Sequence, residues 1–188
     1  MTHSPAPVPA HADQDHILDT LPGDLMIWVL IVSELLVFGA GLLAFLGMRI
    51  MDPIAFAHDQ DSLNRVAGAV NTIILISSGY LAARAVHSAQ HMRKWLAGSM
   101  ILGVAFLIVK WMEYADKARH GIGIESSDFF TFYYLLTGFH AMHVLAGLVI
   151  FALMMRWPNP RNLEGGVMFW HMVDLVWVLL FPIIYLVR

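Results

Sequence analysis

The sequence contains no cysteine, and only 13% of its 188 residues are Asp, Glu, Lys or Arg. The lack of cysteine excludes disulfide bonds, thiolate zinc sites and cysteine-held iron–sulfur clusters, so any metal would need His, carboxylate or Met ligands. The low charge content excludes an ordinary soluble domain, because a soluble core needs a polar cover. The eleven Lys and Arg residues are scattered, which excludes a basic face and makes nucleic acid an unlikely class of partner.

Apolar side chains are abundant, at 59% of the residues and a mean hydropathy of +0.67. A helix surrounded by lipid can be apolar on every side, so this composition indicates an integral membrane protein. A helix of about 20 residues crosses the hydrocarbon core. The sequence therefore predicts an all-α bundle of five transmembrane helices, near residues 24–49, 67–91, 95–119, 129–155 and 166–187. Because the linkers are short, we expect consecutive helices to pack as antiparallel neighbours.

The first 23 residues form a separate region that is rich in His, Asp and Pro and has no Lys or Arg. This composition predicts a disordered polar tail ahead of a membrane domain at 24–188, with an N-cap at Asp24 for the first helix. A signal peptide is not expected, because the positive n-region is missing and the first apolar run is long enough to span. Apart from Lys110, which lies inside a predicted span, five Lys and Arg residues fall on each side, so charge does not predict the orientation.

Several ionisable residues fall inside the predicted spans. Glu34 lies about 15 Å into the first span, close to the middle of the bilayer. A charge at that depth costs about 2.5–3.5 kcal/mol, so it should face protein and be paired. Lys110 and Glu113 are three residues apart in the third span, hence on one helix face, and can neutralise each other as a structural pair.

Two further pairs have the same spacing, His140 with His143 in the fourth span and His171 with Asp174 in the fifth. Packing histidines are the simplest interpretation, because a neutral imidazole is less costly in lipid than a carboxylate. Asp174 needs a partner such as His171 or an indole N–H. Imidazole and carboxylate also suit iron, copper or zinc, so a stand-alone membrane metalloenzyme is an alternative. Counted from their shared side, His143 and His171 differ by about 10 Å in depth, which argues against one compact site.

A second alternative is a proton or small-ion carrier that runs through Glu34 and Lys110. Both alternatives leave a set of short motifs unexplained. These motifs are "IVSELLVFGAG" with Ser33, "NTIILISSGY" with Asn71 and Thr72, "KWMEYADK" with Tyr114, "LLTGFHAMHVLAGL" with Thr137 and Gly138, and "FWHMVDLVWVLLFPIIYL" with Trp170 and Trp177.

The five motifs resemble those of the cytochrome c oxidase subunit III superfamily of haem-copper complexes. The resemblance implies a subunit III-like bundle that corresponds to the last five helices of the family's seven-helix form. The opening "PGDLMIWVLIVSELLVFGAG", Lys110 ahead of Glu113 and Tyr114, and the ending "WHMVDLVWVLLFPIIYLVR" are most similar to the NorE-type branch, which accompanies nitric oxide reductases in denitrification. The same superfamily includes subunit III of oxygen-reducing cytochrome c and quinol oxidases, where it supports proton uptake.

The resemblance implies a non-catalytic accessory subunit without catalytic residues or a metal site of its own. Haem with copper or non-haem iron is then expected only in the partner, the catalytic subunit of a nitric oxide reductase or haem-copper oxidase. Phospholipid is expected in the clefts between helices, and Glu34 matches the family's buried, carbodiimide-reactive glutamate. The implied location is the bacterial inner membrane, with a cytoplasmic amino terminus and a periplasmic carboxyl terminus. The residues expected to be buried or to face the partner are Glu34, Lys110, Glu113, His140, His143, His171 and Asp174.

Overall fold

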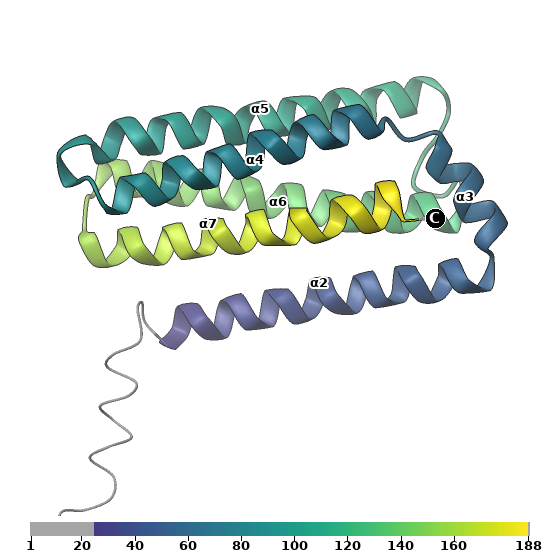
Figure 1. The fold of residues 1–188 in the computed structure, drawn as a ribbon, viewed down its shortest axis with the longest axis horizontal. Coiled ribbons are helices and arrows are strands. Elements are labelled where there is room, and N and C mark those ends of the chain that lie inside the picture. Colours follow the sequence, from purple (N-terminus) through teal and green to yellow (C-terminus); the bar gives the residue numbers. More distant parts are fainter. Residues whose placement is uncertain (1–24, 188) are drawn as a thin grey trace, which may run out of the picture.

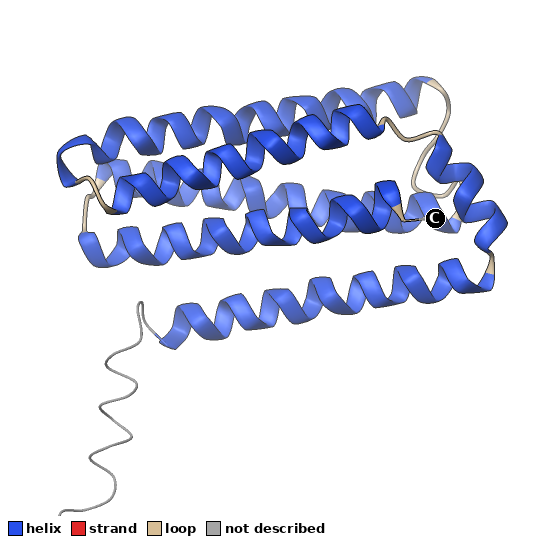
Figure 2. Cartoon of the chain, in the orientation of Figure 1, coloured by secondary structure: helices blue, strands red, loops and turns tan. Residues whose placement is uncertain are grey.

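A computed structural model describes residues 25–187, which form a bundle of long helices (Figure 1). Every regular element within these residues is a helix, which confirms the predicted all-α class (Figure 2). The predicted polar tail and the predicted cap at Asp24 lie outside the described residues.

Five helices are long and apolar enough to cross a membrane, and they correspond to the five predicted spans. They are α2 (Leu25–Met51), α4 (Arg65–Val86), α5 (Met92–Arg119), α6 (Asp128–Arg156) and α7 (Pro160–Phe181), which continues into the π-helix η2 (Pro182–Leu186).

Two predicted boundaries are wrong by five or six residues. Helix α4 ends at Val86 rather than near 91, and a 3-10 helix, η1 (Ala89–His91), carries the turn into α5. Helix α7 begins at Pro160 rather than near 166. A proline in the first turn costs no hydrogen bond, because the N–H it lacks has no partner there in any helix. The earlier start places His171 deeper in the membrane than the sequence indicated.

One helix was not predicted at all, the short α3 (Pro53–Asp61) between α2 and α4. Its signal is local: the Asp52 carboxylate accepts from the Ala55 N–H at 3.1 Å, and Pro53 follows the cap at the first helical position. Gln60 of α3 is buried and donates hydrogen bonds of 2.9 Å to the carbonyls of Ile184 and Val187. Helix α3 therefore anchors the end of η2.

The helices do not all pack in chain order. Helix α4 packs most extensively on α5 and also on α7, α6 contacts α5 and α7, and α2 packs on α6 and α7. The expectation that consecutive spans are neighbours is therefore wrong for α2 and α4. Figure 1 shows the reason: α3 carries the chain across one end of the bundle, so that α7 lies between α2 and α4.

The closest packing, between α4 and α5, depends on small side chains. Ser78 donates to the Ser99 carbonyl at 2.8 Å, its Oγ lies 2.9 Å from the Ser99 hydroxyl, and Ala82 is fully buried beside it. Small residues let transmembrane backbones approach, and their hydroxyls bond across the interface. The rest of the core is mainly large apolar and aromatic side chains, which include Phe45, Phe106, Tyr133, Trp170 and Trp177.

Candidate functional site

Glu34 of α2 pairs with His143 of α6. The Glu34 Oε2 atom lies 3.1 Å from His143 Nε2, and the carboxylate keeps 26% of its side chain exposed. This pairing agrees with the expectation that a carboxylate at this depth faces protein and has a partner. His140 and Lys110 each lie in other surroundings, described below.

The hydrogen bonds of His143 determine how many protons this pair holds. His143 Nδ1 lies 2.9 Å from the Phe139 carbonyl oxygen, and a carbonyl only accepts, so Nδ1 carries a hydrogen. The contact from Nε2 to Glu34 then contains one proton, held either by the carboxyl or by the imidazole. Both arrangements are neutral as a pair. The Glu34–His143 pair therefore carries no net charge in the membrane.

Lys110 and Glu113 of α5 form the most deeply buried ion pair. Lys110 Nζ donates to Glu113 Oε2 at 3.0 Å, to the Tyr185 hydroxyl at 2.6 Å and to the Tyr133 hydroxyl at 3.2 Å. Tyr185 in turn donates to Glu113 Oε1 at 2.9 Å. Both carboxylate oxygens and all three ammonium hydrogens thus have partners. The structure places the predicted pair together, and α6 and η2 supply the two tyrosines.

Aromatic rings surround the same ammonium group. Lys110 Nζ lies 4.8–5.4 Å from the ring centroids of Tyr114, Tyr133, Trp177 and Tyr185. A desolvated cation gains roughly 2 kcal/mol from a well-placed ring face, so these contacts offset part of the cost of burial. Neither Tyr133 nor Tyr185 was predicted from the sequence to contact Lys110.

His140 of α6 is a packing side chain. Its ring is fully buried, and neither ring nitrogen has a hydrogen-bond partner within the described residues. It packs edge-on to Phe106 at 5.5 Å between centroids and against Trp177 at 5.1 Å. Such surroundings favour a neutral imidazole. His140 therefore separates the Glu34–His143 pair from the Lys110 cluster.

His171 and Asp174 of α7 lie together against α4. His171 Nδ1 is 3.8 Å from Asp174 Oδ2, which is an ion-pair distance rather than a hydrogen bond. Both groups press on Gly79, where a Cβ atom would come within 1.9 Å of Asp174 Oδ2 and 3.4 Å of His171 Nδ1. Glycine at this position makes the space that the pair occupies.

The motif residues on α4 and α7 mostly hold helices together. Trp177 Nε1 donates to the Thr72 hydroxyl at 3.0 Å, and Thr72 donates to the Gly68 carbonyl of its own helix at 2.9 Å. Asn71 is buried and reaches the Phe106 carbonyl of α5 at 3.4 Å. These bonds fix α4 against α5 and α7.

Motif residues on the other helices have the same role. Tyr114 and Thr137 join α5 to α6 through a hydroxyl contact of 2.7 Å, and Gly138 lies beside Tyr114. Trp170 is fully buried, and its indole covers glycines of α5 and α6 so closely that a Cβ there would clash. Ser33, by contrast, is exposed and donates only to the Leu30 carbonyl of its own helix at 2.8 Å.

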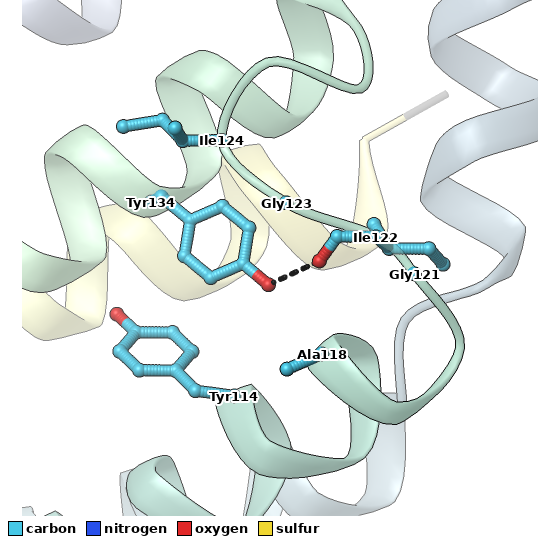
Figure 3. Close-up of a pocket in the computed structure, with 7 residues that line it drawn as sticks. All are labelled: Tyr114, Ala118, Gly121, Ile122, Gly123, Ile124 and Tyr134. Carbon is cyan, nitrogen blue, oxygen red and sulfur yellow. Dashed lines mark hydrogen bonds between the residues drawn. The ribbon is translucent and has the colours of Figure 1, made fainter.

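Two hollows follow the outer seam between α5 and α6. One, of about 540 Å³, lies below the 120–124 loop, where Tyr134 donates to the Ile122 carbonyl at 2.9 Å and Tyr114 forms the floor (Figure 3). The other, of about 290 Å³, continues along the seam from Tyr114 to Leu145. A third, of about 580 Å³, opens at the α3 end and reaches Glu113 and Lys117.

Within residues 25–187, no group of three or more His, Asp or Glu side chains is placed to hold a metal ion. The earlier start of α7 removes the depth difference that first argued against a shared site. The separation is instead lateral: His143 faces α2, and His171 lies against α4. The two ends of the supposed carrier path, Glu34 and Lys110, also belong to separate clusters.

Comparison with known proteins agrees with the motif residues. A family model described as "Cytochrome c oxidase subunit III" matches residues 22–187. A probable cytochrome c oxidase subunit 3 from Mycobacterium tuberculosis is 30% identical over 177 residues, covering 87% of this chain and 86% of the relative. Cytochrome c oxidase subunit 3 of Corynebacterium diphtheriae is 32% identical over 176 residues, with 85% and 86% covered, and that of Thermostichus vulcanus is 30% identical over 172 residues, with 84% of each covered. The chain belongs to the cytochrome c oxidase subunit III family.

Proposed function

We propose that this chain is the accessory subunit III of an oxygen-reducing haem-copper oxidase, where it packs beside the catalytic subunit and supports its assembly, stability and proton uptake. The observation that carries the proposal is the family match over residues 22–187, together with relatives of that name whose length the chain covers to more than four fifths.

The arrangement of the ionisable groups supports a non-catalytic role. Glu34 is paired with His143, and the Lys110–Glu113 pair has all its hydrogen bonds met. A reacting centre needs side chains that converge on a shared space open to substrate. Here the polar groups instead satisfy one another inside the bundle. Haem and copper, or non-haem iron, are then held by the partner, which is the catalytic subunit.

We also propose that this chain binds membrane lipid. The two hollows along the α5–α6 seam are lined mainly by apolar side chains and have the elongated course that an acyl chain requires. We place the chain in the bacterial inner membrane, with its amino terminus cytoplasmic and its carboxyl terminus periplasmic, on the resemblance to the family.

Association with a nitric oxide reductase is the second candidate function. What favours it is the likeness of the opening segment, of Lys110 with its neighbours and of the closing segment to NorE-type chains. The curated relatives carry oxidase names, so the oxidase function has priority.

A pull-down in mild detergent tests the proposal. The tagged chain should bring a haem-containing catalytic subunit with it, and the eluate should consume oxygen. Consumption of nitric oxide without consumption of oxygen would favour the second candidate. The isolated chain should have no turnover. Stoichiometric haem, iron or copper bound to the chain alone, with redox turnover, would contradict both functions.

A further inference from the structure

The pair formed by His171 and Asp174 combines an exposed imidazole with a buried carboxylate oxygen that has no hydrogen-bond partner within the described residues. Helical rise places both residues about 13–18 Å inside the Asn162–Leu186 span, near the middle of the bilayer. The His171 side chain is nevertheless 46% exposed, whereas that of Asp174 is 11% exposed. A polar group at this depth is expected to face protein.

Two hydrogen-bonding atoms of the pair lack partners in the described part of the chain. His171 Nε2 makes no hydrogen bond there, and Asp174 Oδ1 is buried without a donor. The 3.8 Å contact from Asp174 to His171 Nδ1 leaves Nε2 on the exposed side of the ring. Nε2 needs a hydrogen-bond partner from outside the described residues in either tautomer, a donor when the proton is on Nδ1 and an acceptor when it is on Nε2.

The lipid-facing surface of α5 and α6 differs from this one. The large exposed side chains at mid-depth on α5 and α6 are apolar, and they include Ile101, Val104, Ile108, Met142, Leu145 and Val149. Such a surface needs nothing but acyl chains around it. The contrast singles out the surface made by Ile76 and Tyr80 of α4 with His171, Leu175 and Val178 of α7, here named the His171 face.

We propose that the His171 face is the docking surface for one transmembrane helix of the catalytic subunit, which supplies a polar side chain that hydrogen-bonds His171 Nε2 near the bilayer centre. The identity of the partner rests on the proposed function. Gly79 contributes by leaving room for the ring to lie against α4 beside Asp174. The docked helix packs against the exposed residues of α7 in the His171 face, with α4 along one of its sides.

A second copy of this chain is a poorer occupant. A twofold dimer brings equivalent residues together, so His171 would meet His171 across the axis. Two imidazoles with the same protonation would present like to like, either acceptor to acceptor or N–H to N–H. The unmet bond would remain unmet, so a partner with a different side chain at this depth fits better.

Because the chain has no cysteine, single cysteines can report on each face without background. We would label Leu175→Cys and Val178→Cys with a benzophenone maleimide in membranes that contain the whole complex, and compare them with Met142→Cys and Val104→Cys on the α5–α6 surface. Irradiation should join this chain to the catalytic subunit from the His171 face, at least about tenfold more than from the controls. Equal or greater crosslinking from the controls would overturn the proposal, as would an adduct of two copies of this chain.

A substitution gives an independent test. In an Asp174→Asn background, which leaves no carboxylate without its partner, His171→Leu should leave membrane accumulation and unfolding unchanged but should lower retention of the catalytic subunit in detergent by about three- to tenfold relative to Asp174→Asn alone. His171→Gln in the same background, which offers both a carbonyl and an amide N–H, should restore part of that retention. Retention of the complex by the His171→Leu variant at the level of Asp174→Asn alone would refute the docking surface. Absence of any haem protein from the wild-type eluate would instead refute the proposed function, and with it the partner.

Discussion

Removing the charge of Lys110 alone should destabilise the protein more than removing the charges of both Lys110 and Glu113. Lys110→Met keeps the length of the side chain but leaves the Glu113 carboxylate with a single donor, Tyr185. Breaking a buried pair by removing one partner costs about 3–5 kcal/mol, because the remaining charge is uncompensated. We expect a loss of that size for Lys110→Met.

The reverse change should cost less. In Glu113→Gln the ammonium keeps the Tyr133 and Tyr185 oxygens, gains an amide carbonyl and retains the surrounding ring faces. We therefore expect about 1–3 kcal/mol for Glu113→Gln, and about 1 kcal/mol for the double variant with Lys110→Met, since no buried charge remains there. The sum of the two single costs should exceed the double cost by at least about 3 kcal/mol, because the residues belong to one network.

The assay is unfolding of the purified chain in mixed detergent micelles with increasing dodecyl sulfate, followed by the fluorescence of the six tryptophans. Lys94→Met is the matched control, because Lys94 is an exposed lysine on the same helix and its loss should stay within about 0.5 kcal/mol. Additive costs in the double variant, or a Lys110→Met protein as stable as wild type, would refute the reasoning that the pair is held by mutual neutralisation.

Three further changes probe other contacts. Gly79→Ala should cost about 1–3 kcal/mol in the same unfolding assay, because its methyl group would meet a carboxylate oxygen of α7 at 1.9 Å, whereas Gly39→Ala, with nothing within 4 Å, should stabilise by about 0.5–1 kcal/mol; equal effects would contradict this account. Gln60→Leu removes two donors from the end of η2 and should speed hydrogen exchange of the last described residues, and unchanged exchange would show that α3 does not anchor them. His143→Phe should lower membrane accumulation more than Glu34→Gln. In Glu34→Gln the new amide can still donate to the imidazole, whereas in His143→Phe the Glu34 carboxylate has no partner. The opposite order would exclude the shared-proton arrangement.

Much of the fold could be predicted because lipid imposes a simple length rule. Five apolar stretches of about 20 residues are visible without knowing their neighbours. The boundaries and the short α3 were harder, since capping by Asp52 and a proline at the first position of α7 act over three or four residues and change hydropathy little. Which helices touch was less predictable still, because the route of α3 decides that α2 meets α6 and α7.

The candidate site was predictable where partners share one helix. A spacing of three residues was enough to expect Lys110 beside Glu113, and His171 beside Asp174. Contacts between helices were not accessible in this way. The depth of His143 made it one of several candidates for Glu34, and only the rotation of α6 chooses it over His140. Tyr133 was missed because a tyrosine in an aromatic segment carries no sign of which cation it faces.

The distribution of hydrogen bonds argues against a continuous path for protons through this bundle. Transfer between Glu34 and Lys110 would require a chain of donors and acceptors, yet within the described residues neither nitrogen of the buried His140 has a partner, and its neighbours include Phe106 and Trp177. Each buried pair is instead closed locally and joins particular helices: α2 to α6 at His143, and α5 to α6 and α7 at Lys110. Closed pairs specify how helices fit, because any other rotation would strand a charge in lipid. By the same reasoning, the His171–Asp174 pair, whose hydrogen bonds are incomplete within the described residues, specifies contact with a helix of another chain.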